Sequence, residues 1–223
     1  MVDKMKEKDN IYVKSLVISI FIFLSGMMFG ILIDNYRISH IRKSLMSDII
    51  FWDDSIFLTR LKELYGEGFC SEALELNLLY NQKIYERGKE IEEMIKLNRF
   101  APEMREELRK YTLMQVKFWL DSRDLKEKCN FTYKNVLYLQ DFFAKEQEVR
   151  LRNKVQSKIM LDVKERCGNK ILLIPINMDL NLTTVDVIKL RYNVTRSPTI
   201  IIDDKIVLEG IVSLQDLLKI LEC

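Results

Sequence analysis

The run of residues from Ile11 to Ile33 constrains this chain more than any other part of it, because its only charged side chain is Lys14. A helix rises about 1.5 Å per residue, so the run is long enough to cross a hydrocarbon layer of roughly 30 Å. Lys14 lies near one end, where its long side chain reaches the polar interface. We expect an uncleaved span rather than a signal peptide, because the run is too long for a signal peptide's apolar region and no A-x-A-like site follows it.

Three features bear on the side of the membrane that the rest of the chain occupies. Lysines precede the span and a few cationic residues follow it, so the positive-inside rule favours a cytoplasmic N-terminus only slightly. Three N-x-[ST] sequons, at Asn130, Asn181 and Asn193, are candidates for glycosylation, which occurs outside the cytoplasm. Four cysteines also suit an oxidising location. We therefore expect a single-pass protein of the cell membrane whose C-terminal part is extracytoplasmic.

Composition and single residues exclude several kinds of function. A net charge of +2 gives no indication of nucleic-acid binding. His40 is the only histidine and follows the span closely, which argues against a catalytic triad or a His-rich metal site. No phosphate-binding glycine loop occurs in the sequence. We expect no cofactor, no metal and no nucleic-acid partner.

The segment from Tyr36 to about Lys128 has the spacing of helices, with apolar residues three and four apart. An apolar stripe continues outward from the span through Ile41, Leu45, Ile49, Trp52, Ile56 and Leu61. Gly66 and Gly68 favour a break. A second helix is expected from about Ser71 to Asn98, and a third begins near Pro102, which suits a first turn. The short connection predicts an antiparallel hairpin.

An antiparallel hairpin brings two cysteines to the same end. Cys70 lies as far before the turn as Cys129 lies after it. The two can form a disulfide, or they can remain separate small apolar residues at the helix ends.

After Asn130 short apolar runs alternate with amphipathic segments, in the order βαβαββα. We expect Gly168 to end the first helix, a threonine to cap the second and Ser213 to cap the last. A helix between the first two strands requires a parallel, right-handed crossover, and Asp203–Asp204 fits a hairpin turn between the last two strands. The expected fold is α/β, with a mixed sheet and helices on both faces. The expected domains are 1–35 with the span, 36–130 with the hairpin, and 131–223.

The last part of the chain reads Y-x-V-x-x-x-P-T, followed by an expected hairpin, a glycine and a closing helix, with Tyr192, Val194, Pro198, Thr199 and Gly210 in order. Through this pattern the sequence from about residue 131 resembles the thioredoxin-fold superfamily. The whole layout also resembles uncharacterised membrane-anchored thioredoxin-like proteins of archaea. The resemblance implies a cis peptide bond between Ser197 and Pro198, which explains a proline directly before a strand.

The chain differs from that family in the segment that carries the family's redox-active cysteines. A redox-active thioredoxin carries C-x-x-C at the start of its first helix, with one thiol of lowered pKa. The corresponding segment, Asp141 to Arg150, contains no cysteine. The resemblance also places Cys129, Cys167 and Cys223 at the opposite end of the sheet. Cys129–Cys167 and Cys167–Cys223 are therefore alternatives to the hairpin disulfide.

Our leading hypothesis is a redox-inactive thioredoxin-like protein that binds a protein or peptide partner through backbone hydrogen bonds at a sheet edge. The candidate binding residues are Ser197, Pro198 and Thr199 together with Phe143, Ala144, Lys145 and Glu146. We assign no catalytic residue. One alternative is a thiol–disulfide oxidoreductase or isomerase that uses other cysteines. Another is a helical assembly factor of a membrane complex, in which the hairpin captures the partner.

Overall fold

The computed structural model describes residues 14–33, 54, 66–98 and 102–223. The chain divides into two compact units, residues 1–58 and residues 59–223. The helix expected directly after the span, with its apolar stripe, and His40 lie outside the described residues.

Within the described part of the first unit, the helix Lys14–Ile33 is long and apolar enough to cross a membrane. None of its most apolar stretch is buried against other parts of the protein. Length and composition are the properties that favour a membrane span here, and they agree with the sequence-based expectation.

The second unit opens with a helical hairpin. It consists of a short 3-10 helix η1 (Gly66–Phe69) and two long helices, α2 (Cys70–Asn98) and α3 (Pro102–Cys129). Close to the turn, the Arg87 guanidinium binds the Glu107 carboxylate at 3.2 Å, and both side chains are largely buried. One helical turn farther from the hairpin connection, the Tyr111 hydroxyl donates a hydrogen bond to the carbonyl of Ile84 at 3.1 Å. Pairs that lie progressively farther from the turn are the mark of an antiparallel hairpin.

A four-stranded sheet follows, and its element order is the expected βαβαββα. The elements are β1 (Lys134–Gln140), α4 (Gln147–Cys167), η2 (Gly168–Lys170), β2 (Ile171–Asn177), α5 (Thr183–Arg191), β3 (Thr199–Ile202), β4 (Ile206–Glu209) and α6 (Leu214–Leu221). The strands are ordered β2-β1-β3-β4. β1 and β2 are parallel, whereas β3 is antiparallel to both of its neighbours. The carboxyl ends of β1 and β2 therefore meet the start of β3 at one end of the sheet.

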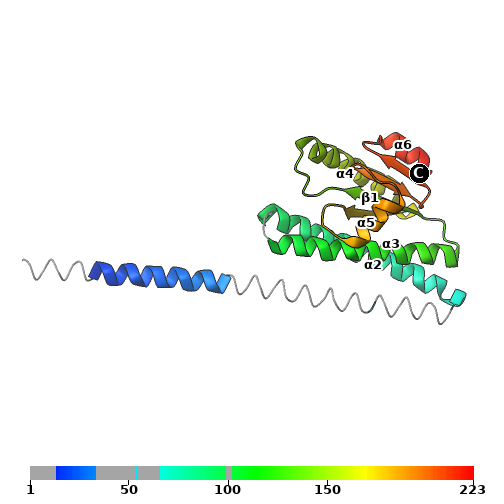
Figure 1. The fold of residues 1–223 in the computed structure, drawn as a ribbon. Coiled ribbons are helices and arrows are strands. Elements are labelled where there is room, and N and C mark those ends of the chain that lie inside the picture. Colours follow the sequence, from blue (N-terminus) through cyan, green and yellow to red (C-terminus); the bar gives the residue numbers. More distant parts are fainter. Residues whose placement is uncertain (1–13, 34–53, 55–65, 99–101) are drawn as a thin grey trace, which may run out of the picture. The chain divides into compact units, whose positions relative to one another are not determined.

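Helices cover both faces of this sheet (Figure 1). On one face α4 and α6 pack over a core that includes Val136, Met160, Ile200 and Leu217, all almost fully buried. The other face is covered by α5 and by α3, which contacts β1 and β2. The hairpin thus supplies one layer of the folded unit, and packing continues across residue 130, where the sequence pattern changes from helices to alternating strands and helices.

The ends of the helices agree with the sequence in two cases and differ in one. Gly168 stops α4 with a φ of 54°, a conformation that glycine adopts without steric cost. Ser213 caps α6, because its side chain accepts a hydrogen bond from the Asp216 amide. The expected threonine cap of α5 is wrong. Leu182 is the N-cap residue, and its side chain is buried. Thr183 follows it as the first residue of the helix and so lies within the first turn.

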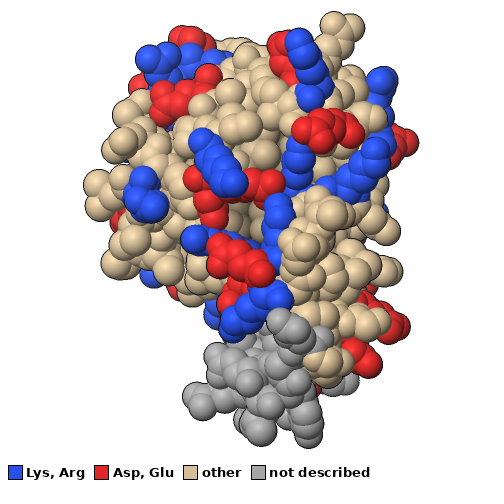
Figure 2. Space-filling model, turned by 90° about the vertical axis from the view of Figure 1, so that its right-hand side faces the viewer, with Lys and Arg blue, Asp and Glu red and all other residues tan. Residues whose placement is uncertain are grey.

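The turn between β3 and β4 forms two ion pairs with α3 and so holds the α2–α3 hairpin against the sheet. Asp203 and Asp204 both have positive φ, as expected for turn residues. The Asp203 carboxylate binds Lys126 of α3 at 2.7 Å, and the Asp204 carboxylate binds Arg123 of α3 at 2.9 Å. The face at the right of Figure 1 is drawn in Figure 2, where Lys and Arg side chains alternate with Asp and Glu. On that face charges of opposite sign are interleaved rather than gathered into one patch.

Candidate functional site

The loop after β1 and the segment before β3 meet at the end of the sheet where β1 ends. The Ser197 hydroxyl donates to Asn153 Oδ1 at 2.8 Å and accepts from the Asp141 amide at 2.9 Å. Asn153 Nδ2 in turn donates to the Asp141 carbonyl at 2.8 Å. The peptide bond between Ser197 and Pro198 is cis. A closed set of polar contacts therefore joins two of the segments that the sequence assigned to one site.

Asp179, which follows β2, fixes the same loop from the other side. Its carboxylate accepts the amides of Phe142, at 3.0 Å, and of Phe143. Burial raises the pKa of the Asp141 carboxyl above its ordinary value of 3.8, and the negative charge of Asp179 adds to the rise, while Lys189 opposes it. The ionised form of Asp141 is therefore less favourable in the folded protein than in the unfolded chain.

We expect the substitution Asp141→Asn to raise the free energy of unfolding at pH 7. A raised folded pKa means that ionisation of Asp141 costs stability above that pKa, whereas below about 3.9 both states are protonated and the cost disappears. The advantage of the variant should therefore shrink as the pH falls. Urea unfolding of both proteins across this pH range measures it, with Asp162→Asn on the exposed side of α4 as the control. A variant that is less stable than the parent at pH 7 would contradict this assignment.

The three candidate binding residues around the proline are more deeply buried than we expected for a peptide-binding edge. Ser197 is 5% exposed, and Pro198 and Thr199 are also buried. The Pro198 carbonyl accepts the Gly210 amide at 2.7 Å, and Thr199 pairs with strands on both sides. Among the contacts of the described residues, the main-chain N–H and C=O of Ser197 have no protein partner. The groups without a partner at this edge are therefore main-chain groups rather than side chains.

Glu209 of β4 holds the segment that leads to Ser197. Its carboxylate accepts hydrogen bonds from the Thr195 amide at 2.7 Å and from the Thr195 hydroxyl at 3.1 Å. The Arg196 guanidinium lies 3.7 Å from the same carboxylate and is itself mostly exposed. The bond from the Thr195 amide is the main reason that the pKa of Glu209 lies below its ordinary value. The backbone on the amino side of Ser197 is thus positioned by a charged acceptor.

The other candidate residues divide into a covered and an exposed pair. Phe143 and Ala144 are half-buried, whereas Lys145 and Glu146 are exposed. The guanidinium carbon of Arg105, in the first turns of α3, lies 4.6 Å from the centre of the Phe143 ring. The helical hairpin therefore contacts the loop and shields one of its aromatic rings, so the exposed part of the candidate surface begins at Lys145.

The first turn of α4 lies directly after the loop of candidate binding residues and fixes it. Gln147 is the first residue of this helix and Arg150 the fourth. The Arg150 guanidinium donates to the carbonyls of Ala144 and Lys145, at 2.8 and 2.5 Å. The side chain that fixes the loop is thus a cation at the start of α4.

All four cysteines of the chain are paired, as Cys70–Cys129 and Cys167–Cys223. The first joins the start of α2 to the end of α3, and the second joins the end of α4 to the residue after α6. The alternative Cys129–Cys167 is wrong. Treating the other two pairs as mutually exclusive was also wrong, because they share no cysteine and both form.

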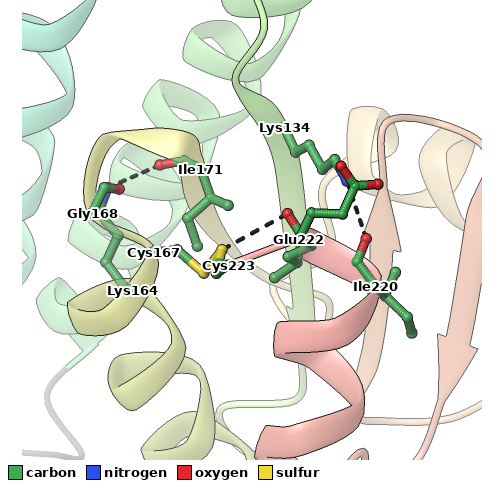
Figure 3. The surroundings of a disulfide bond; sticks show 9 residues. Lys134, Lys164, Cys167, Gly168, Ile171, Ile220, Glu222 and Cys223 are labelled. Carbon is green, nitrogen blue, oxygen red and sulfur yellow. Dashed lines mark hydrogen bonds and ion pairs between the residues drawn. A yellow bond between two sulfur atoms is a disulfide. The ribbon is translucent and has the colours of Figure 1, made fainter.

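Both disulfides lie at the sheet end opposite Ser197. Near Cys167, Lys164 donates to the carbonyls of Gly168 and Ile171, at 2.7 and 2.9 Å, and Ile171 is paired with the first residue of β1 (Figure 3). Desolvation of Lys164 lowers its pKa. Seven residues of β1 separate this end from the loop at Asp141, a distance of about 20 Å. None of the four cysteine sulfurs therefore lies beside the Ser197 edge.

Sequence reasoning did not find Asn153, Asp179 or Glu209, which position the site. Asn153 lies within α4, and its bonding partner Ser197 lies 44 residues further along the chain. A helical spacing pattern contains no signal for such a pair. Among the described residues, no group of three or more His, Cys, Asp or Glu side chains is arranged to hold a metal ion.

Comparisons with known proteins yield structural similarity only. No family model and no curated protein sequence matches the chain. One similar solved structure is described as thioredoxin-2, a component of the malaria parasite protein secretion machinery; it shares 23% identity over 40% of this chain and 82% of its own, with a TM-score of 0.32. Another, described as a malarial protein, shares 23% identity over 40% of this chain and 94% of its own, with a TM-score of 0.31.

Proposed function

We propose that this chain is a single-span membrane protein whose redox-inactive, thioredoxin-like domain binds an extended peptide segment of a partner protein outside the cytoplasm. The observation that supports it best is the arrangement of the sulfurs. The Ser197 edge has a main-chain N–H and C=O without a protein partner among the described residues, but Gln147 and Arg150 stand where exchange chemistry requires thiols. The domain is therefore suited to hold a peptide without exchanging electrons with it.

The unpaired backbone of Ser197 defines how a peptide binds. A strand running alongside this residue can accept from its N–H and donate to its C=O, as in other cases where a peptide adds to a sheet edge. Buried main-chain polar groups without partners are unfavourable, so such pairing also satisfies the edge itself. The Glu209 contacts to Thr195 hold the segment in place before the peptide arrives, which reduces the entropy lost on binding.

The exposed residues around this edge supply contacts for peptide side chains. Ile211 is 51% exposed and directly follows Gly210, whose amide binds the Pro198 carbonyl. Lys145 and Arg196 are exposed on the loop and on the segment before Ser197. We expect the bound segment to carry an apolar residue opposite Ile211 and to tolerate acidic residues near the two cations.

We expect Ile211→Glu to reduce peptide capture by the full chain at least about tenfold, because the peptide loses its apolar contact with the exposed half of Ile211 and a charge would have to be desolvated there. A random peptide library displayed on phage, selected against the detergent-solubilised chain, provides the ligands, and fluorescence anisotropy measures their affinity. The matched control is Leu161→Glu, an equally exposed position of α4 about 20 Å from its first residue.

Two results would contradict the proposal. One is selection of peptides whose binding is unaffected by Ile211→Glu but lost with substitutions on α2, which would favour the hairpin as the capturing part. The other is insulin reduction by the natural chain, which would show that one of the two disulfides exchanges and that the protein is an oxidoreductase.

A further inference from the structure

We propose that Asn130 and Asn181 are N-glycosylation acceptors in the folded protein, and that Asn193, although it lies in a sequon, is not. The part of this inference that concerns cells rests on the extracytoplasmic location proposed above. The discrimination among the three sequons rests on the folded structure alone.

All three sequon asparagines occupy exposed turns at the ends of helices. Asn130 follows α3, Asn181 precedes α5 and Asn193 follows α5, and their φ angles are 53°, 53° and 52°. Asparagine adopts this left-handed conformation more readily than most residues. In the described contacts none of the three side-chain amides has a protein hydrogen-bond partner. Each of the three exposed residues therefore presents a side-chain amide that no described contact occupies.

Asparagines outside the sequons show the contrast. Asn77 and Asn153 are buried and their side chains are hydrogen-bonded within the fold. Asn169 is exposed, but no serine or threonine stands two positions after it. Accessibility and the sequon coincide only at Asn130, Asn181 and Asn193 within the described residues.

The hydroxyl residue of each sequon separates the three sites. A sequon requires Ser or Thr two positions after the asparagine, so the transferase must read that side chain as well. Thr132 and Thr183 are exposed, and no contact among the described residues occupies their hydroxyls. Both the amide and the hydroxyl of Thr195 are bound by the Glu209 carboxylate, at 2.7 and 3.1 Å. In the folded protein the Asn193 side chain of the third sequon therefore has no hydrogen-bond partner among the described residues, but the Thr195 hydroxyl of the same sequon is occupied.

The reaction joins the asparagine side chain to a lipid-linked oligosaccharide. The amide nitrogen forms a bond to C1 of the first sugar, the bond from C1 to the lipid phosphate oxygen breaks, and the phosphate departs with the bonding electrons. The amide proton passes to a base of the transferase. No oxidant or reductant is needed, and the donor is a polyprenyl-phosphate or polyprenyl-diphosphate oligosaccharide.

The test uses the folded full chain in detergent, an oligosaccharyltransferase and its lipid-linked donor, with glycopeptide mass spectrometry as the readout. We expect carbohydrate on Asn130 and Asn181 and at least about tenfold less on Asn193, where the hydroxyl residue is held by a charge-assisted hydrogen bond. The variants N130Q and N181Q should each lose one glycan, and the control N169Q should lose none. Synthetic peptides of the three sequons should be modified equally well, which shows that the fold makes the difference.

Unmodified Asn130 and Asn181 in a folded chain whose peptides are accepted would overturn the inference, as would modification of Asn193 at the same rate. The same analysis of protein purified from its native membranes separates this inference from the proposed location. If the sites are modified with purified enzyme but not in cells, and the cysteines react with a membrane-permeant maleimide, the domain lies in the cytoplasm. The proposed location then fails while the acceptor geometry stands.

Discussion

With cysteine at both Gln147 and Arg150, this domain is expected to reduce insulin disulfides at least about tenfold faster than the natural chain. A thiol at the start of a helix has a lowered pKa, and a shift from 8.5 to about 7 gives roughly ten times more thiolate at neutral pH. The two positions open α4 and are spaced as in C-x-x-C. Under the proposed function, the sheet edge beside Ser197 would present a client to these two thiols.

The control for this gain keeps the spacing and removes the helix start. Lys158→Cys with Leu161→Cys places the same C-x-x-C on an exposed stretch of α4 between its ends, and should show no gain. Arg150→Ala measures the effect of losing the guanidinium contacts to the loop. The gain should be seen at pH 7 in a turbidity assay of insulin reduction. Equal activity of the two engineered pairs would show that the Ser197 edge does not act as a thioredoxin edge does.

The second large effect is expected from the Cys167–Cys223 disulfide. Replacing both residues with alanine should lower the free energy of unfolding by about 4 kcal/mol, because the cross-link closes a long loop and restricts the unfolded chain. The cysteines are 56 residues apart in sequence. Loss of the link also leaves α6, an eight-residue helix, held by its packing alone. Urea unfolding of the full chain in detergent measures the change.

A matched comparison is available in the same chain. Cys70 and Cys129 are 59 residues apart, so replacing them with alanine should cost a similar amount. The two double variants should differ in where they loosen: hydrogen exchange should rise in α6 for the first and at the start of α2 for the second. A loss below about 1 kcal/mol in the Cys167–Cys223 variant would contradict the entropic account.

Much of the fold follows from local patterns. The order of strands and helices, the stop at Gly168, the cap at Ser213 and the turn at Asp203–Asp204 each depend on a few neighbouring residues, and each agrees with the structure. The prediction of a threonine cap for α5 was wrong because burial of Leu182 outweighed the capping preference of threonine. A local preference of about 1 kcal/mol is smaller than the benefit of burying a leucine.

The candidate site was predicted less completely because its supports are distant in sequence. The loop and the proline segment were expected to meet, and the contacts of Asp141 with Ser197 bring them together. The polar residues that hold them, Asn153 and Asp179, have ordinary sequence surroundings. The packing of α3 against the sheet, with Lys126 on Asp203, likewise joins residues 77 positions apart. Periodicity identifies which face of a helix is apolar but not which element will cover it.

The Cys70–Cys129 bond has a mechanical consequence. Cys70 is the residue at which the chain arriving from the N-terminal side enters α2, and Cys129 is the residue from which the chain continues towards β1. If the chain is anchored as proposed, tension arriving at Cys70 would pass through two sulfur atoms to Cys129, so the covalent load path would bypass the hairpin. A domain pulled by its anchor would keep both long helices wound while the load is borne by covalent bonds.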